Sequence, residues 1–336
     1  MKRKKMHAIA ALAAVSLAAT LTACSDSGSS SDATSESGDE AVTVAVSYGG
    51  LKFPYHSALK RGLIAMADEL GNVELIEGDS DGDTGVELTN VQNMLQQQPD
   101  CLLIIPVSNS SSAPAEEAEA AGIPVVSFDQ IAAGPTDAFV GYDQLQSGEL
   151  LGQFVVDQYE AIGKPKIKVI YLRGLIGQAA DTSRNEGVKA TLEAAGLGAD
   201  QVEIVEQAAD YDRAKAQEIT TTLLRQHSDA DVIIANNDDM ILGAHAGAQA
   251  LGIATGPDSD LHLAGIDGVP EALTLIADGE LDATMFQDPV EEANVGLPTC
   301  VAAANGEPVE DTVLAFRQVT IDDADAALES VQSVYE

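Results

Sequence analysis

The chain has 336 residues, enough for two domains of ordinary size, and its 45% hydrophobic and 21% charged residues are typical of a soluble globular protein. This composition excludes uniform disorder and collagen-like repeats. The chain carries 17 Lys and Arg against 54 Asp and Glu, a formal net charge of -37. Because a phosphate backbone repels such a chain, we expect no nucleic-acid partner.

The N-terminal segment predicts export. A basic run at residues 2–5 precedes an uncharged, apolar or small stretch at residues 8–23, the two-part pattern of a secretory signal. The stretch ends in LTAC (21–24), which resembles the lipobox of bacterial lipoproteins, whose cysteine is acylated. This resemblance implies a lipoprotein signal peptide over residues 1–23 and a lipid anchor on Cys24, with an ordinary signal as the alternative. Cleavage removes four cations and no anion, which changes the net charge from -37 to -41.

Residues 24–41 predict a tether that follows the anchor. After Cys24 this segment is rich in Ser, Gly and Asp and has no hydrophobic periodicity. Such a composition is typical of a flexible, solvated linker. The globular part is therefore expected to begin at Val42.

From Val42 onward, short apolar runs rich in Val and Ile alternate with amphipathic helical patterns, which indicates βαβ units and parallel sheets. The runs start at residues 42, 73, 101, 124 and 138, and, after a loop around residues 163–165, at residues 168, 202, 231, 262 and 283. Helices are predicted between them, for example over Ser57–Leu70 and Arg213–Gln226. Because the series repeats, we predict an α/β fold of two doubly wound, Rossmann-like lobes rather than one large sheet.

Polar residues stand at or just after the carboxyl ends of several runs. They are Asp129, Asp143, Asn237, Asp267 and Gln287. Ligands of open parallel sheets bind outside that edge, so two facing lobes would enclose a crevice lined with amides and carboxylates. The alternative role for each such residue is the N-cap of the next helix, which we assign to Asp143 and Asp238.

Motifs of several enzyme classes are absent from the sequence. It has no GxxxxGK[ST] loop, no GxGxxG after the first run, no GxSxG and no HExxH. We therefore expect no catalytic residues, no cofactor and no metal ion. Cys101 and Cys300 are expected to be small buried residues, and a disulfide between them is compatible with export, although the sequence leaves their separation open.

Eight segments, in this order and at these spacings, resemble the type I periplasmic binding proteins of sugar ABC transporters, and the ribose-binding group most closely. The segments are FPY (53–55), IPV (105–107), GIPVVSFD (122–129), VGYD (140–143), DYDR (210–213), NNDDMILG (236–243), GIDG (265–268) and QDP (287–289). The resemblance extends from Val42 to about Val319. It implies two lobes joined by a three-segment hinge, with the ligand cleft between them.

The resemblance also implies a set of ligand-binding residues. Aromatic rings suit the apolar face of a sugar, and Asp, Asn and Gln suit its hydroxyls. The expected site residues are Phe53, Tyr55, His56, Asp129, Gln130, Tyr142, Thr182, Tyr211, Asn237, Asp267 and Gln287.

Two positions depart from the pattern of the family. Gln130 and Thr182 stand where sugar binders of this group commonly have arginine, so two strong donors are expected to be missing. Arg173 is a candidate to restore one cation, with a solvated position as the alternative. The transport role is unaffected, but a deoxy sugar, a polyol or another neutral small molecule fits as well as ribose.

The resemblance implies an extracytoplasmic, lipid-anchored binding protein that delivers a neutral sugar or polyol to an ABC permease with its cytoplasmic ATPase. We expect a monomer on the outer face of the cell membrane, or in the periplasm of a Gram-negative cell. By analogy, one lobe comprises residues 42–142 and about 288–316, and the other residues 143–287 and about 317–336. The alternatives are a binding protein that feeds a chemoreceptor or sensor kinase, and a secreted glycosidase using Asp129 and Asp267.

Overall fold

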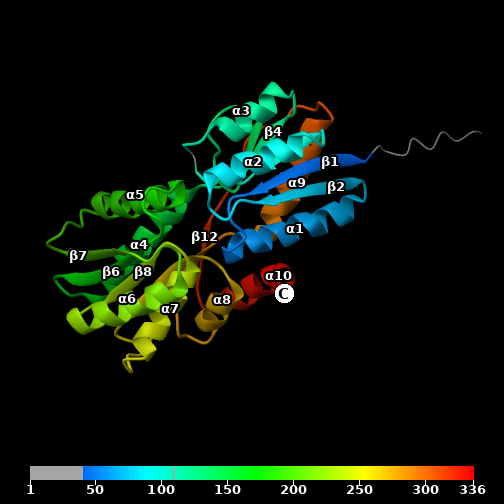
Figure 1. Cartoon of the computed structure of the whole chain (residues 1–336). Helices are drawn as coiled ribbons and strands as arrows, with labels where there is room; N and C mark the ends of the chain where they lie inside the picture. The colour runs from blue at the N-terminus through cyan, green and yellow to red at the C-terminus, as the bar shows by residue number, and fades with distance from the viewer. Residues whose placement is uncertain (1–40, 109) are drawn as a thin grey trace, which may run out of the picture. The chain divides into compact units, whose positions relative to one another are not determined.

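The computed structural model describes residues 41–108 and 110–336. The predicted signal peptide, Cys24 and nearly all of the tether lie outside the described residues. The described residues belong to one compact unit (Figure 1). Within the described ranges, no helix is both long enough and apolar enough to cross a membrane.

The first sheet contains the first five predicted runs and one further strand (Figure 1). Its order is β11-β5-β4-β3-β1-β2, and every pair of neighbours is parallel. The strands are β1 (Val42–Tyr48), β2 (Val73–Asp79), β3 (Cys101–Ile104), β4 (Val125–Phe128), β5 (Ala138–Tyr142) and β11 (Thr312–Leu314). The helices associated with it are α1 (Pro54–Leu70), α2 (Thr84–Leu95), α3 (Ala113–Ala120) and α9 (Pro289–Ala304).

The second sheet repeats this arrangement with the order β12-β10-β9-β8-β6-β7. Its strands are β6 (Ile167–Arg173), β7 (Val202–Ala208), β8 (Val232–Ala235), β9 (His262–Asp267), β10 (Ala283–Phe286) and β12 (Arg317–Val319), of which only β12 is antiparallel to its neighbour. Its helices are α4 (Gln144–Ile162), α5 (Ala179–Ala194), α6 (Arg213–Gln226), α7 (Asp238–Gln249), α8 (Pro270–Ala277) and α10 (Ala324–Tyr335). The prediction of two doubly wound lobes is therefore confirmed.

Strand alternation distributes side chains to the two faces of each sheet. In β1, Val44 and Val46 pack with α1 and α9, whereas Ala45 packs with α2 and α3. In β6, Val169 packs with α4 and α5, whereas Ile170 packs with α6 and α7. Helices thus cover both faces of both sheets, which explains why the central strands read as continuous apolar runs, whereas the edge strands β2 and β7 also contain charged residues.

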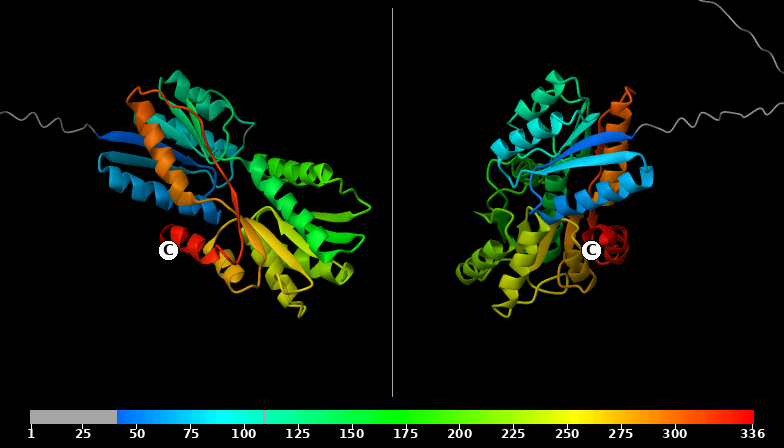
Figure 2. Two further views of the ribbon diagram at one scale, coloured as in Figure 1. Left: turned by 180° about the vertical axis from the view of Figure 1, so that it is seen from behind. Right: turned by 45° about the vertical axis from the view of Figure 1, so that its right-hand side comes forward.

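The chain passes between the sheets three times. It leaves the first sheet after β5, returns after β10 to form α9, and passes directly from β11 to β12. This last passage is the orange-red segment in Figure 2. The two short strands β11 and β12 therefore form one edge of each sheet, and the other five strands of the second sheet, β6–β10, are inserted between β5 and α9.

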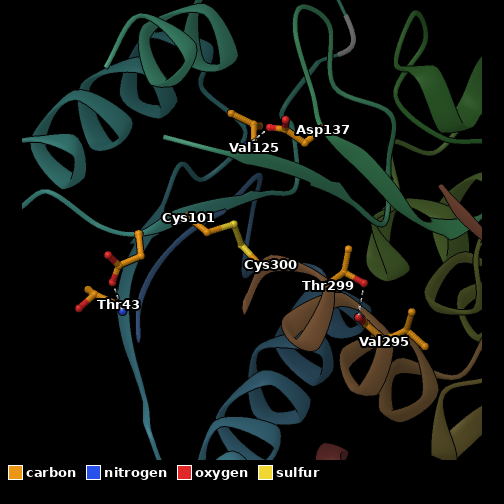
Figure 3. The surroundings of a disulfide bond; sticks show 8 residues. Thr43, Cys101, Val125, Asp137, Val295, Thr299 and Cys300 are labelled. Carbon is orange, nitrogen blue, oxygen red and sulfur yellow. Dashed lines mark hydrogen bonds between the residues drawn. A yellow bond between two sulfur atoms is a disulfide. The ribbon is translucent and has the colours of Figure 1, made fainter. Parts of the chain in front are cut away.

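A disulfide joins Cys101 at the start of β3 to Cys300 in α9 (Figure 3). Both residues are fully buried, as expected, and their Cα atoms are 5.8 Å apart. The disulfide left open by the sequence is thus present. It fastens the returning helix α9 to the first sheet across a separation of 199 residues.

Candidate ligand-binding site

A cavity lies where carboxyl ends of strands from both sheets meet, and encloses about 440 Å³ of space that is partly open to solvent. Nine of the predicted site residues line it, namely Phe53, Tyr55, His56, Asp129, Gln130, Tyr211, Asn237, Asp267 and Gln287. Residues far apart in the sequence and borne by different sheets are thus brought to one place.

Tyr142 was predicted to line the cleft, but it lies outside this cavity. Its ring packs against Phe316, with centroids 5.0 Å apart. Its hydroxyl accepts a hydrogen bond from the Asp288 backbone N–H at 2.9 Å and donates to Glu291 Oε2 at 2.9 Å. The ring is taken up by contacts among the crossing segments, so it does not form a cleft wall.

Thr182 also lies outside the cavity, and the matching of this position to an arginine was wrong. Its side chain is exposed, and its hydroxyl donates to the Gln178 carbonyl at 3.0 Å. Two residues later, Arg184 is 5% exposed and lines the cavity. Because consecutive helix residues are rotated by about 100°, a two-residue shift turns a side chain about 200° around α5. The cavity therefore contains an arginine that was expected to be missing.

Arg184 is held by groups of its own lobe and of the first crossing. Its Nε and Nη2 donate to Gln144 Oε1 at 3.0 and 2.7 Å, and its Nη1 donates to the Asn236 carbonyl. Nη2 also lies 3.8 Å from Asp267 Oδ1. Gln144, Gln178 and Ala180 line the cavity as well and were missed, since no sequence motif marks them.

Arg173 does not supply a cation to the cavity. Its Nε donates to Asp181 Oδ1 at 2.9 Å, and its Nη1 lies 3.1 Å from Glu206 Oε2. Arg173 is absent from the cavity lining. Both alternatives considered for this residue were therefore wrong, because it is a buried ion-pair partner at the end of β6.

The wall from the first lobe is built around Asp129. Its Oδ2 lies 3.1 Å from His56 Nε2 and accepts a hydrogen bond from Gln130 Nε2 at 3.4 Å. His56 Nδ1 lies 3.1 Å from the Gly50 carbonyl oxygen. The ring of Phe53 stands edge-to-face with His56, with centroids 5.6 Å apart. A buried carboxyl, an imidazole and an aromatic ring thus share one wall.

Behind this wall, the Tyr55 hydroxyl donates to Glu292 Oε2 at 2.5 Å. The hydroxyl is therefore engaged with α9 within the first lobe. Burial raises the pKa of Glu292 well above its ordinary value, and the nearby charge of Asp129 raises it further. Glu292 is consequently held as the neutral acid over a wider pH range than a surface glutamate.

The opposite wall contains Tyr211, whose ring lies against the backbone at Gly174. A Cβ atom at Gly174 would come within 2.1 Å of Tyr211 Cζ, so only glycine permits this contact. The ring also meets Phe53 edge-to-face, with centroids 6.0 Å apart. The buried Tyr211 hydroxyl has no hydrogen-bond partner among the described residues. It is thus a buried donor that the described part of the protein leaves unsatisfied.

Asp267 and Gln287 are neighbours in the part of the cavity lining that belongs to the second lobe. Gln287 Nε2 donates to Asp267 Oδ1 at 2.9 Å, while Gln287 Oε1 has no partner among the described residues. Burial raises the pKa of Asp267 well above its ordinary value; the Arg184 charge opposes this shift and that of Asp238 adds to it. These two residues thus provide a buried amide acceptor, Gln287 Oε1, and a carboxyl group with reduced acidity, that of Asp267.

The helix-cap assignments were right for Asp143 and wrong for Asp238. Asp143 caps α4 by accepting from the Leu145 N–H, but α7 is capped by Asn237, whose Oδ1 accepts from the Met240 N–H at 3.0 Å. Asp238 is fully buried and accepts from the backbone N–H groups of Gly268 and Val269. Asn237 thus uses its oxygen for the helix, and its side-chain amide nitrogen remains as a donor at the cavity.

Residues 44–308 match the model of the family described as the periplasmic binding protein domain. The chain belongs to this family. This periplasmic binding protein is 31% identical over 299 residues to the ribose import binding protein of Bacillus subtilis, covering 88% of this chain and 92% of that relative. The resemblance to the ribose-binding group is therefore confirmed.

Two further relatives have other ligands in their names. This periplasmic binding protein is 28% identical over 334 residues to the xylitol-binding protein of Mycolicibacterium smegmatis, covering 97% of this chain and 88% of that relative. A solute-binding protein of an ABC transporter from Bacillus halodurans, solved with bound myo-inositol, superposes with a TM-score of 0.78 at 28% identity, covering 87% of this chain and 99% of that chain.

Proposed function

We propose that this chain is the extracytoplasmic substrate-binding protein of an ABC importer and that it captures a neutral sugar or polyol between its two lobes. The observation that carries the proposal is the cavity itself, which both lobes line with aromatic rings, amides and carboxyl groups. The names of the relatives support the ligand class, since they include ribose, xylitol and myo-inositol. The cavity's cation Arg184 lies close to the Asp267 carboxyl group, with Nη2 3.8 Å from Oδ1, which favours a ligand without net charge.

The polar groups of the cavity suit hydroxyl groups. The Tyr211 hydroxyl can donate to a ligand oxygen, and Gln287 Oε1 can accept from a ligand hydroxyl. Each hydroxyl both donates and accepts, so one polyol satisfies both kinds of group. An apolar ligand would leave these buried groups unpaired, at a cost of about 1–3 kcal/mol each. The ring of Phe53 offers a face for the C–H groups of a sugar.

We propose a binding role, not a catalytic one. The two carboxyl groups considered for glycoside hydrolysis are both engaged, Asp129 with His56 and Asp267 with Gln287. Membership of a solute-binding family supports the same role.

We propose that the lobes comprise residues 42–142 with about 288–316, and residues 143–287 with about 317–336, and that they close on the ligand about the three crossings. The sheet memberships of β11 and β12 support these boundaries. Contacts of Tyr142 support a hinge there, because its ring meets Phe316 of one crossing and its hydroxyl meets Asp288 of another.

We propose that Cys24 is acylated and that it anchors the protein to the outer face of the cell membrane as a monomer. The support is the signal-like sequence of residues 1–24. Labelling of the expressed protein with a fatty-acid analogue tests this proposal, with Cys24→Ala as the control. Equal labelling of the variant and the natural chain would contradict it.

The ligand class is tested by calorimetry and thermal shift with D-ribose, D-allose, xylitol, myo-inositol and glycerol. A ligand present at a hundredfold excess over its Kd stabilises the folded state by about 2.7 kcal/mol. Gln287→Leu removes the side-chain amide, whose Oε1 has no partner among the described residues, and should abolish the shift, whereas the exposed Thr182→Ala should leave it unchanged. Failure of every neutral polyhydroxylated compound to bind would refute the proposed ligand class.

A further inference from the structure

His56 is a buried imidazole with acceptor oxygens next to both of its ring nitrogens. Its Nδ1 lies 3.1 Å from the Gly50 carbonyl oxygen, and its Nε2 lies 3.1 Å from Asp129 Oδ2. The side chains of His56 and Asp129 are 8% and 4% exposed. Water therefore contributes little to the contact between these two groups.

Counting hydrogen atoms constrains the charge of the pair. A carbonyl oxygen only accepts, so Nδ1 must carry a hydrogen. The contact between Nε2 and Oδ2 then requires one more hydrogen, either on the nitrogen or on the oxygen. With the hydrogen in either place, His56 and Asp129 together have no net charge. Without it, the lone pair of Nε2 faces a carboxylate, the contact becomes repulsive, and the buried pair has a charge of about -1.

The surroundings make that extra negative charge costly. Glu292 lies behind Asp129, and Asp267 lies across the cavity. Burial raises the pKa of both carboxyl groups, and the charge of Asp129 raises each further. Across the cavity, the guanidinium of Arg184 is bound by Gln144 and the Asn236 carbonyl. The phenol of Tyr55 is bound to Glu292, and the nearby Glu291 adds to the rise in the pKa of Glu292.

Gln130 adds no charge beside Asp129. Its amide donates to Oδ2, the same oxygen that faces His56. Both side-chain donors from the described residues therefore use one oxygen of Asp129, and His56 is the ionisable donor of the two. These contacts hold the carboxyl group in one orientation within the cavity wall.

We propose that His56 is a positioning residue, that it shares one proton with Asp129, and that the protein binds its sugar or polyol tightly only while the pair holds this proton. The shared proton fixes Oδ2 against His56 and leaves Oδ1 for a ligand hydroxyl. The ligand part of this inference rests on the proposed function; the proton sharing does not. Ligand affinity then falls about tenfold per pH unit above the pH at which the pair loses its proton.

The proton sharing is tested without a ligand, by nitrogen NMR of the histidine rings in the mature chain from about pH 5 to about pH 9. Nδ1 of His56 is expected to stay protonated throughout, and the pair to lose one proton in a single step. Asp129→Asn should move that step to lower pH because the anionic partner is lost. The inference would be overturned if Nδ1 of the neutral ring carried no hydrogen, or if Asp129→Asn did not change the pH at which the step occurs.

The effect on binding is measured by calorimetry over the same pH range with D-ribose, xylitol and myo-inositol as probes. His56→Gln retains an amide donor but removes the titrating ring, so the change in affinity at the NMR step of the natural chain should disappear. His262→Gln is the matched control, because His262 faces Asp282 at 2.8 Å at the amino end of β9, outside the cavity lining. This control should keep the pH dependence of the natural chain.

The outcomes separate the inference from the proposed function. Binding of a probe with the same affinity on both sides of the NMR step would overturn the positioning role of His56. Binding of no probe at any pH would refute the proposed ligand class, and the ligand part of the inference with it, while the NMR titration still decides the proton sharing.

Discussion

The disulfide between Cys101 and Cys300 has a large calculable effect on stability. It closes a loop with a sequence separation of 199 residues that contains the whole of β6–β10. The chain-entropy relation gives a stabilisation of about 5 kcal/mol for a loop of this length, an upper estimate because it ignores residual structure in the unfolded chain. The Cys101→Ala/Cys300→Ala variant should therefore lose up to about 5 kcal/mol of unfolding free energy.

The measurement is urea unfolding at equilibrium, followed by circular dichroism. Thr299→Ala is the matched control, since it changes the neighbouring residue of α9 and removes only a hydrogen bond to the Val295 carbonyl within the helix (Figure 3). It should cost about 1 kcal/mol or less. Because both cysteines lie outside the cavity lining, binding of a probe sugar below the transition should be unchanged. A double variant within about 1 kcal/mol of the natural chain would refute the loop-closure argument.

Three further predictions concern other parts of the fold. Gly174→Ala places a Cβ within 2.1 Å of Tyr211 Cζ and should weaken probe binding at least about tenfold by calorimetry, whereas Gly198→Ala, whose Cβ meets nothing closer than 3.8 Å, should not. Burial raises the pKa of Asp238 to about 7, so the folded state binds more protons than the unfolded state between about pH 4 and 7. The unfolding free energy should therefore fall as the pH rises through that window, by at most about 4 kcal/mol. Urea unfolding at several pH values should show that the unfolding free energy of Asp238→Asn changes less with pH than that of the natural chain. Tyr142→Phe removes the hydroxyl that meets Asp288 and Glu291 and should lower the unfolding free energy by about 1–3 kcal/mol, measured by urea unfolding; an unchanged value would show that these contacts do not stabilise the crossings.

Much of the fold follows from local patterns in the sequence. The ten apolar runs all become strands, eight of them almost wholly buried and two, β2 and β7, partly exposed at sheet edges. The helix predicted at Arg213–Gln226 has the predicted bounds. The strands β11 and β12 were not predicted as runs. Each has three residues, TVL and RQV, which is too short for a periodicity, and each is a strand only because a long sheet edge is available to it.

The site residues were predictable where the end of a strand fixes their position. They were less predictable where their position depends on the residue at which a helix begins, or on a contact with a distant part of the chain. Asp129, Asp267 and Gln287 follow or end strands whose edge must face the cleft. The position of Arg184 depends on where α5 begins, and a two-residue error exchanges the inner and outer faces of that helix. Tyr142 ends a strand as well, but its side chain points toward the crossing segments, where it contacts Asp288, 146 residues away in the sequence.

The many acidic residues of the chain also have a different effect inside the cleft than on its surface. On the exposed surface, where most Asp and Glu lie, the excess charge is solvated and favours solubility. In the cavity region, Asp129, Asp267 and Glu292 are buried together, and three buried carboxylates would repel one another strongly. The raised pKa values of Asp267 and Glu292 and the contact of Asp129 with His56 each reduce that charge. A site assembled from acids can therefore bind a neutral ligand, because burial and one histidine keep most of its carboxyl groups from carrying a free charge.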